Sequence, residues 1–433
     1  MSEFKILDFK DKYKGVMVFN KNKNAKIHRW YPFVEGYSKE FIVGILDELD
    51  YTPTHCLEPF AGSGTTGLEL QHKNIKCTSF EVSPFMHLLS KVKMRNDYTT
   101  RTLNKYIQQL QEDLRNIPDN IFDFIKIPVK RKITSIDESE EKVNYSKSVM
   151  EGICDIKKAI YNIADKKYKN LFLIALGSIL PSVGNLYRNG KCMSYKKVFP
   201  DYSREDVHEI FINKLKNDIT EDVEYIGKLK KDGIKYSNGR NIILGDVRKN
   251  LLRLENNSCD LIITSPPYLN SRDYTDTYMM ELWILDLVKD YKDVRDLRKK
   301  TIRSHVQIKW ETPKLLENEL LSDVMKELSV NEDSYWNESI PNMILSYFKD
   351  MDIIFNEFSR VMKKNSAIYW NVANSAYFGV KIPTDEITAQ IAETHGFKVI
   401  EFREAREVRT SSQQKDVVGK LRESVIVMKK SDV

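Results

Sequence analysis

The chain has 433 residues, of which 41% are hydrophobic, so it is long enough for two domains or for one enlarged domain with a sizeable core. Its formal net charge of +6 indicates only a weak general attraction to polyanions. The five cysteines show no CxxC pair and no zinc spacing, which argues against disulfides and structural zinc. The sequence has no run of membrane-spanning length and its first residues lack the apolar core of a signal peptide, so we expect a cytoplasmic protein.

An aromatic segment near the start, residues 27–38, contains Trp30 and Tyr31. Ser38 is a good N-cap for the helix expected next, whose apolar face includes Phe41 and Ile45. The aromatic residues could contact a ligand, or they could be packing residues that lead into the helix.

A glycine turn follows, with an apolar strand before it at Cys56-Leu57 and a helical segment after it. Strand, glycine turn and helix predict the first unit of a doubly wound α/β sheet, because a ligand can lie against bare backbone in such a turn. The spacing Gly62-x-Gly64-x-x-Gly67 also fits the dinucleotide fingerprint, so a NAD site stays open. A P-loop is excluded because Leu68 and Glu69 stand where Lys and Ser or Thr are required.

Two further predicted strands end in carboxylates. Glu81 ends the next strand about 20 residues past the first glycine, the distance at which a carboxylate can bind a ribose. Asp246 follows the strand that we expect near residues 241–244. Either acid could instead be an ordinary surface or turn residue.

Residues 101–238 separate the glycine turn from the later strands and are too many for a simple crossover. They include a charged stretch, 130–142, which we expect to be a surface loop, and an apolar stretch, 171–180, which we expect to be a buried helix. Cations then alternate with amides and aromatics, a mixture suited to phosphate and base-edge contacts but also typical of a solvated loop. The cations of this stretch are Arg188, Lys191, Lys196 and Lys197.

The sequence Ser265-Pro266-Pro267-Tyr268 directly follows an apolar strand at 260–263. Two prolines remove two backbone donors and end the strand in a rigid turn. Such a turn offers carbonyl groups, a hydroxyl and a flat aromatic surface to a planar group that carries an amine. Further on, Arg272, Arg298 and Arg303 could contact a phosphate backbone or lie on a solvated helix face. Strands are expected at 366–372 and, at the sheet edge, at 421–428.

The Ser-Pro-Pro-Tyr turn and the string from Glu58 to Thr66 resemble the S-adenosylmethionine-dependent DNA amino-methyltransferases, with the cofactor motif before the catalytic motif. The spelling is most similar to the cytosine-N4 branch; adenine-N6 members more often have Asp or Asn in place of Ser265. The resemblance covers residues 27–98 and 240–428. It implies a doubly wound, Rossmann-like α/β sheet with a largely helical inserted domain. The implied domains are 1–100 (N-terminal and cofactor-binding), 101–238 (candidate target recognition) and 239–433 (catalytic).

The resemblance also implies residue roles. The cofactor, S-adenosyl-L-methionine, would contact Trp30, Tyr31, Glu58, Phe60, Gly62, Ser63, Gly64, Thr65, Thr66, Glu81, Val82 and Asp246. Ser265 and the carbonyl of Pro266 would accept the amine hydrogens of the base, with Pro267 completing the turn. Tyr268 would stack on a base that has been flipped out of the duplex. No metal is implied.

The implied function is site-specific methylation of cytosine N4 in double-stranded DNA, in restriction–modification or phage defence, with a cognate restriction endonuclease as partner. Adenine-N6 methylation, RNA base methylation and a catalytically silent nucleic-acid-binding subunit remain alternatives, and a NAD-dependent dehydrogenase is a more distant one.

Overall fold

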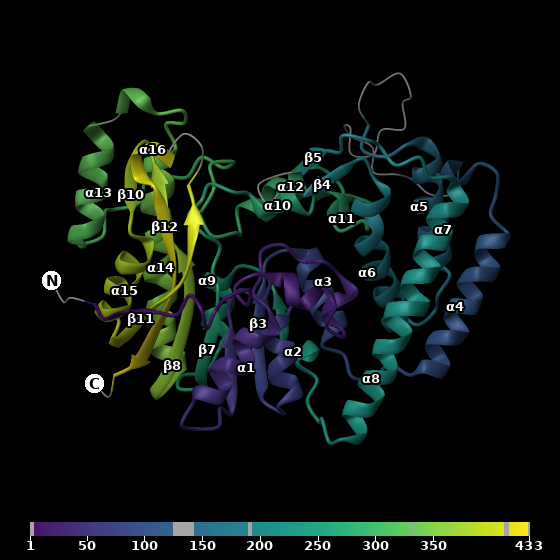
Figure 1. The fold of residues 1–433 in the computed structure, drawn as a ribbon, viewed down its shortest axis with the longest axis horizontal. Helices are drawn as coiled ribbons and strands as arrows, with labels where there is room; N and C mark the ends of the chain where they lie inside the picture. The colour runs from purple at the N-terminus through teal and green to yellow at the C-terminus, as the bar shows by residue number, and fades with distance from the viewer. Residues whose placement is uncertain (1–3, 124–142, 189–192, 331, 411–414, 432–433) are drawn as a thin grey trace.

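The computed structural model describes residues 4–123, 143–188, 193–330, 332–410 and 415–431. These residues form a mixed α/β protein around an eight-stranded sheet with the order β1-β11-β12-β8-β7-β2-β3-β6 (Figure 1). The strands are β1 (Ile6–Asp8), β2 (His55–Glu58), β3 (Lys76–Glu81), β6 (Ile242–Leu244), β7 (Cys259–Thr264), β8 (Met362–Ala373), β11 (Phe397–Arg409) and β12 (Lys420–Lys430). None of the helices in the described ranges is both long enough and apolar enough to cross a membrane.

The strands from β8 to β6 are parallel, so their carboxyl ends meet at one edge of the sheet. β12 runs antiparallel to both of its neighbours, β8 and β11. The prediction that residues 421–428 form an edge strand is therefore wrong. The β11 strand pairs beside β12, and the three-residue β1 pairs parallel to β11, so β1 and β6 form the edges.

Alternate residues of the central strands pack on opposite faces of the sheet, as the two-residue period of a strand requires. One face contributes Leu57, Ile262, Ile368, Trp370 and Ile426 to a core with α14 (Ile340–Val361) and α15 (Thr384–Thr394). The other face contributes Cys56, Leu261, Ile263, Tyr369 and Val425 to a core with α1 (Lys39–Glu48) and α2 (Thr65–His72). Helices therefore cover both faces. The helix expected after Ser38 is α1, but the Ser38 hydroxyl donates to the Val18 carbonyl, 2.6 Å away, instead of capping it.

The segment between β3 and β6 is largely helical and lies to one side of the sheet in Figure 1. Its elements are α3 (Pro84–Lys93), α4 (Thr100–Arg115), η3 (Ile121–Asp123), α5 (Lys147–Tyr161), α6 (Lys166–Val183), the hairpin β4 (Leu186–Arg188) and β5 (Met193–Tyr195), α7 (Arg204–Asn213), the π-helix η4 (Lys214–Ile219), α8 (Thr220–Lys231) and η5 (Asn238–Arg240). The predicted buried helix at 171–180 is confirmed within α6. The charged stretch 130–142 lies outside the described residues.

Short elements complete the chain. They are η1 (Phe19–Lys23), η2 (His28–Trp30), α9 (Val247–Asn250), η6 (Leu251–Arg253), α10 (Tyr274–Thr277), α11 (Met279–Ile284), α12 (Tyr291–Arg298), α13 (Glu319–Val330), η7 (Glu332–Ser334), β9 (Ser375–Tyr377), β10 (Val380–Ile382) and α16 (Lys415–Val418). Several of them follow the carboxyl ends of the parallel strands and build up that edge of the sheet.

Candidate active site

A cavity of about 680 Å³ lies at the carboxyl ends of the parallel strands. Its walls come from the segments that follow β2, β3, β6 and β7 and from the end of β8. The N-terminal segment 33–37 contributes a further wall. In an open α/β sheet this edge is the usual ligand site, because the loops that leave neighbouring strands diverge there.

The glycine turn after β2 is held by hydrogen bonds from its neighbours. Gly62 and Gly64 have φ angles of 50° and 78°, which favour glycine. The Gly62 N–H donates to Glu81 Oε2 at 2.7 Å, and the Gly62 carbonyl accepts from Ser90 Oγ at 2.7 Å. The Ser63 carbonyl accepts from Lys93 Nζ at 2.8 Å. Helix α3 thus fixes two consecutive carbonyls of the turn.

Glu58 connects the glycine turn to the strand that leads to Ser265. Its buried carboxylate accepts from the Phe60 N–H at 3.0 Å, from the Tyr37 hydroxyl at 3.1 Å and from Thr264 Oγ1 at 2.5 Å. Burial raises the pKa of Glu58, and these hydrogen bonds oppose that rise. Because Thr264 immediately precedes Ser265, one carboxylate sets the spacing between the two turns that the sequence singled out.

Glu81 lines the cavity at the end of β3. Its two oxygens accept from the Gly62 N–H and, at 2.8 Å, from the Ser83 N–H. Burial raises the pKa of Glu81 to about 7, and the two N–H donors counteract part of that effect. The carboxylate is therefore oriented by backbone donors while its side chain still faces the cavity.

The residues expected to bind the cofactor divide into two groups according to whether they line the cavity. Phe60, Gly62, Ser63, Thr65, Thr66, Glu81 and Val82 line the cavity, whereas Trp30, Tyr31, Glu58, Gly64 and Asp246 do not. Trp30 and Tyr31 are fully buried: the Trp30 indole donates to Asp222 at 2.9 Å and the Tyr31 hydroxyl donates to Glu281 at 2.8 Å.

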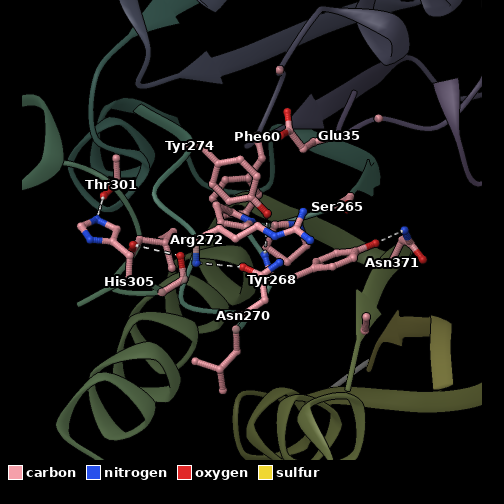
Figure 2. Close-up of a pocket in the computed structure, with 18 of the residues that line it drawn as sticks. Glu35, Phe60, Ser265, Tyr268, Asn270, Arg272, Tyr274, Thr301, His305 and Asn371 are labelled. Atoms are coloured by element: carbon pink, nitrogen blue, oxygen red, sulfur yellow. Dashed lines mark hydrogen bonds between the residues drawn. The ribbon is translucent and has the colours of Figure 1, made fainter. Parts of the chain in front are cut away.

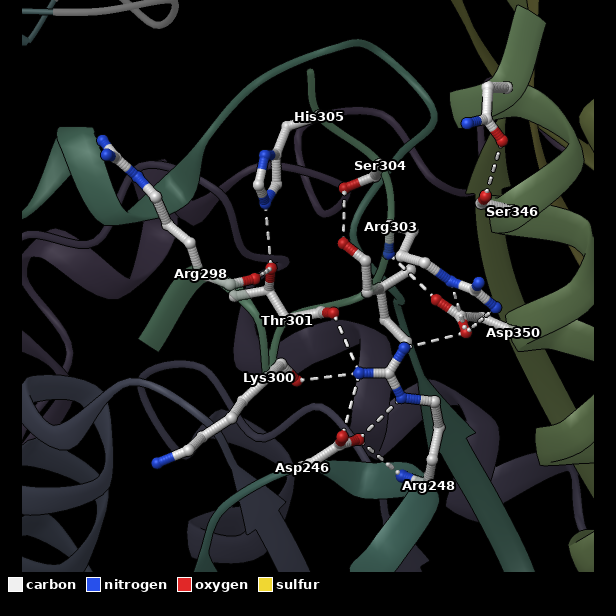
Figure 3. Close-up of polar contacts among 12 residues, drawn as sticks. Asp246, Arg248, Arg298, Lys300, Thr301, Arg303, Ser304, His305, Ser346 and Asp350 are labelled. Atoms are coloured by element: carbon white, nitrogen blue, oxygen red, sulfur yellow. Dashed lines mark hydrogen bonds and ion pairs between the residues drawn. The ribbon is translucent and has the colours of Figure 1, made fainter. Parts of the chain in front are cut away.

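Asp246 caps α9 and forms an ion pair with Arg248 at 2.8 Å, as Figure 3 shows. Only its neighbours Gly245 and Val247 reach the cavity wall. The carboxylate of Asp246 is thus occupied by protein donors, and backbone on either side of it faces the cavity.

All four residues of the Ser-Pro-Pro-Tyr turn line the cavity (Figure 2). The Tyr268 hydroxyl donates to Glu423 at 2.9 Å and accepts from Asn371 Nδ2 at 2.8 Å. Arg406 donates to the other oxygen of Glu423 at 2.6 Å. Burial raises the pKa of the Tyr268 hydroxyl, which stays protonated. The ring is therefore anchored at its far end by side chains of β8, β11 and β12.

The cations proposed to contact DNA lie in different surroundings. Arg188 is almost buried, pairs with Glu281 at 2.5 Å and lies 5.0 Å from the centroid of the Tyr278 ring. Arg298 pairs with Asp273 and, at 2.7 Å, with Asp276. Arg303 pairs with Asp350 at 2.7 Å (Figure 3). These three guanidinium groups are held by internal carboxylates.

The remaining cations are not paired in this way within the described residues. Arg272 lines the cavity, and Lys197 is exposed. Lys196 donates to the carbonyls of Ser182 and Gly184 at 3.0 and 2.6 Å. Lys191 lies outside the described residues.

Several cavity residues were not anticipated from the sequence. Glu35 accepts from the Tyr278 hydroxyl at 2.5 Å, and burial raises its pKa. Tyr274, Asn270 and His305 complete the wall near Tyr268 (Figure 2). Asn371 interrupts an apolar run between Trp370 and Val372, and that contrast is an available signal, whereas Glu423 has the polar neighbours Arg422 and Ser424 and gives none. Within the described ranges, no group of three His, Cys, Asp or Glu side chains is arranged to hold a metal ion.

The buried amine of Lys93 is expected to make stability depend on pH. Burial lowers its pKa to about 7, whereas an unfolded lysine titrates at about 10.4. Between these values the unfolded chain binds more protons, so this group should raise the free energy of unfolding with pH, by at most about 1.4 kcal/mol per unit. Urea unfolding between pH 7.5 and 9.5 should show a steeper rise for the wild type than for Lys93→Met. Lys91→Met, an exposed neighbour on the same helix, should retain the wild-type slope; equal slopes for all three proteins would contradict the prediction.

Comparison with known proteins supplies relatives over most of the chain. It is 25% identical to the Type II methyltransferase M.BsoBI of Geobacillus stearothermophilus, over 95% of this chain and 87% of that protein. It is 26% identical to M.AvaI of Nostoc sp. (89% and 82%) and 24% identical to M.MvaI of Kocuria varians (86% and 82%), both also Type II methyltransferases.

No protein-family model matches the chain. The solved structure of a DNA modification methylase from Thermus thermophilus matches with a TM-score of 0.22 and 12% identity, over 44% of this chain and 52% of that one, a likeness too distant to indicate a shared fold. The sequence relatives are informative because they extend through both halves of the cavity: the chain is homologous to Type II methyltransferases along most of its length.

Proposed function

We propose that this protein is an S-adenosylmethionine-dependent DNA methyltransferase that modifies the exocyclic N4 of cytosine within a specific sequence. The observation that carries the proposal is that the glycine turn, through Gly62, Ser63, Thr65 and Thr66, lines the same cavity as Ser265–Tyr268, about 200 residues away in sequence. The homology to Type II methyltransferases supports a site-specific DNA methyltransferase in restriction–modification. Cytosine N4 as the target, double-stranded DNA as substrate and a cognate endonuclease as partner are part of the proposal.

The cavity has the properties that a nucleoside cofactor needs. Its volume of about 680 Å³ falls within the range of about 300–1,000 Å³ that is usual for small-molecule sites. A Cβ on Gly62 would come within 3.1 Å of the Phe33 ring, so the absence of a side chain keeps this wall open. Glu81, oriented by two N–H groups, would accept from the ribose hydroxyls. When bound, S-adenosylmethionine supplies an electrophilic methyl group on sulfur.

The Ser265 turn would orient the amine of the base. A carbonyl at Pro266 and the hydroxyl of Ser265 can each accept one amine hydrogen, which favours the pyramidal nitrogen that forms as the amine attacks. Fixed dipoles of this kind stabilise a transition state because they need no reorganisation. Tyr268, anchored through Glu423 and Asn371, would stack on the base and hold it in line for transfer.

We also propose the architecture that goes with this function. The strand order, with a parallel centre and an antiparallel β12, supports a doubly wound, Rossmann-like methyltransferase sheet. Residues 1–100 would form the N-terminal and cofactor-binding part, 239–433 the catalytic part, and 101–238 an inserted domain for target recognition. Among the described cations expected to contact DNA, Arg272 lines the cavity and Lys197 is exposed.

The function is tested by analysing DNA from cells that express the protein, digested to nucleosides and measured by mass spectrometry. N4-methylcytosine that is absent with the Ser265→Ala variant is the expected result. Detection of N6-methyladenine would support methyl transfer to an exocyclic amine but would make adenine, not cytosine, the target base. Methylation of RNA alone would overturn the DNA assignment, and cofactor binding without any methylated product would favour a silent subunit.

Tyr268→Ala should lower turnover at least tenfold and leave the affinity for S-adenosylmethionine nearly unchanged, because the ring faces the base in this proposal. Tyr268→Phe should lose less, since the ring remains and Asn371 Nδ2 still reaches Glu423 at 3.1 Å. Calorimetric titration with the cofactor and steady-state methylation separate the two effects. Equal loss of cofactor binding in Tyr268→Ala would contradict this role.

A further inference from the structure

Three aromatic rings form a ledge at the mouth of the cavity: Tyr335, Trp336 and Phe378. Trp336 lines the cavity yet is 56% exposed, an uncommon state for the largest apolar side chain. The rings of Tyr335 and Phe378 are stacked at 4.3 Å and 28°, and the Trp336 ring lies 6.2 Å from Phe378. The indole therefore rests on an aromatic base and presents much of its surface to solvent.

The backbone at Phe378 has an unfavourable conformation, which the packing of its ring stabilises. Tyr377 pairs with Val380, so Phe378 and Gly379 form a two-residue hairpin turn between β9 and β10. Their φ angles are 53° and 81°, the left-handed values of a type I′ turn. A left-handed conformation is unfavourable for Phe, and Asn or Gly would be preferred at that position. The cost is offset where the ring packs against Tyr335.

Two cations lie on the same cavity lining as the ledge. Lys300 is exposed and Arg272 is half-buried, and neither has a carboxylate within ion-pair distance in the part of the chain that the structure describes. The Lys300 carbonyl is fixed by Arg248, while its amine extends away from that cluster (Figure 3). Nearby Arg298 and Arg303 are by contrast paired with carboxylates.

We propose that Trp336 stacks on a nucleobase of the substrate DNA beside the target base, while Lys300 and Arg272 contact the adjoining phosphates. This inference rests on the proposed function and extends it to a second base position. An exposed aromatic face on the same cavity lining as cations without a carboxylate partner is a combination suited to an unstacked nucleic-acid strand. The target base would reach the half-buried Tyr268 inside the cavity. The exposed Trp336 ring would then contact the part of the DNA strand that stays outside the cavity.

Few large apolar side chains of the described cavity lining are strongly exposed, which favours a base over an apolar partner. Apart from Trp336, the one strongly exposed large apolar residue of the described lining is Val34, 44% exposed. A protein or membrane partner would need a contiguous apolar patch of several hundred Å². One indole ring matches the size of one base.

The test combines binding and fluorescence on the full-length protein, with a labelled duplex cut from plasmid DNA that the protein methylates in cells. Trp336→Ala should weaken the binding of this duplex about tenfold and leave the slope of log K against log salt unchanged, because stacking releases no counterions. Lys300→Ala should reduce the steepness of that slope by about one. Leu252→Ala, which is 66% exposed and does not line the cavity, is the matched control and should bind like the wild type.

Fluorescence provides a readout that a merely structural role would not change. Trp30, Trp283 and Trp370 are buried and Trp310 is partly buried, so quenching by DNA should come chiefly from Trp336. Trp336→Phe should keep affinity within about threefold of the wild type and lose most of the quenching. Wild-type affinity in Trp336→Ala, or equal quenching in Trp336→Phe and the wild type, would overturn the inference. A wild type that fails to bind the duplex at all would instead overturn the proposed function.

Discussion

Replacing Asp222 by alanine is expected to lower the free energy of unfolding by about 3–5 kcal/mol, the usual loss when one partner of a buried ionic network is removed. Asp222 is fully buried on α8. Its carboxylate accepts from the Ile27 N–H at 2.7 Å, from the Arg29 guanidinium at 2.7 and 3.1 Å, and from the Trp30 indole at 2.9 Å. Its loss would leave the Ile27 N–H and the Trp30 indole without their acceptor. Among the described residues, Arg29 would keep only the more exposed Glu221 and Asp218 as counter-charges.

Two neighbouring variants separate this network from general effects on the helix. Asp218→Ala removes a carboxylate that is 32% exposed and lies 3.9 Å from the same arginine, so it should cost less than about 1 kcal/mol. Asp222→Asn keeps the shape of the side chain and one acceptor oxygen, so its loss of unfolding free energy should lie between those of Asp222→Ala and Asp218→Ala. Urea unfolding measures all three proteins. A similar small loss for Asp222→Ala and Asp218→Ala would show that residues 27–30 do not depend on this contact.

Buried carboxylates also explain why Trp30 and Tyr31 do not line the cavity, although the sequence predicted that they contact the cofactor. Aromatic residues near a glycine turn suit a ligand wall and a core equally well. The choice between them depends on Asp222 and Glu281, which lie 192 and 250 residues away in sequence. Nothing local to residues 27–38 reveals that buried carboxylates will reach the indole and the hydroxyl.

Features with a local cause were easier to predict. The glycines at 62 and 64 and the two prolines at 266 and 267 restrict the backbone by themselves, and the ends of parallel strands bring those turns to one edge. The edge position expected for 421–428 failed because β1 has only three residues and β11 carries charges along its length. Neither segment has the regular apolar alternation by which a strand is recognised in a sequence, so the two strands outside β12 were not predicted.

Pairing of charges is the other property that the sequence conceals. Arg298 and Arg303 sit in a basic run that suits a phosphate backbone, but Asp273, Asp276 and Asp350 neutralise them in the fold. Which cations remain available depends on contacts of α12 with α10 and of the loop after α12 with α14. Lys300 lies between the two arginines in sequence and has no such partner among the described carboxylates.

Gly64→Ala is expected to lower methylation at least 100-fold through the cofactor step. Gly64 has a φ of 78°, where an alanine costs about 1–2 kcal/mol. A Cβ there would also lie 2.9 Å from Ser90 Cβ and Oγ and 3.1 Å from Ser90 Cα, so α3 would have to move. Since Ser90 Oγ holds the Gly62 carbonyl, that movement would disturb the whole glycine turn.

The double variant Gly64→Ala/Ser90→Gly removes the clashing Cβ and Oγ atoms but keeps the strained φ and loses the Ser90 hydrogen bond to the Gly62 carbonyl, so it should recover only part of the lost cofactor affinity. Gly44→Ala is the matched control: no atom lies within 4 Å of its Cβ position on helix α1, and the change should stabilise the helix by about 0.5–1 kcal/mol with activity unchanged. Titration calorimetry with S-adenosylmethionine and a methylation assay distinguish the cases. Wild-type cofactor affinity in Gly64→Ala would mean that the turn after β2 does not hold the cofactor, and the binding site would then have to be sought on the opposite wall of the cavity, around β8 and β12.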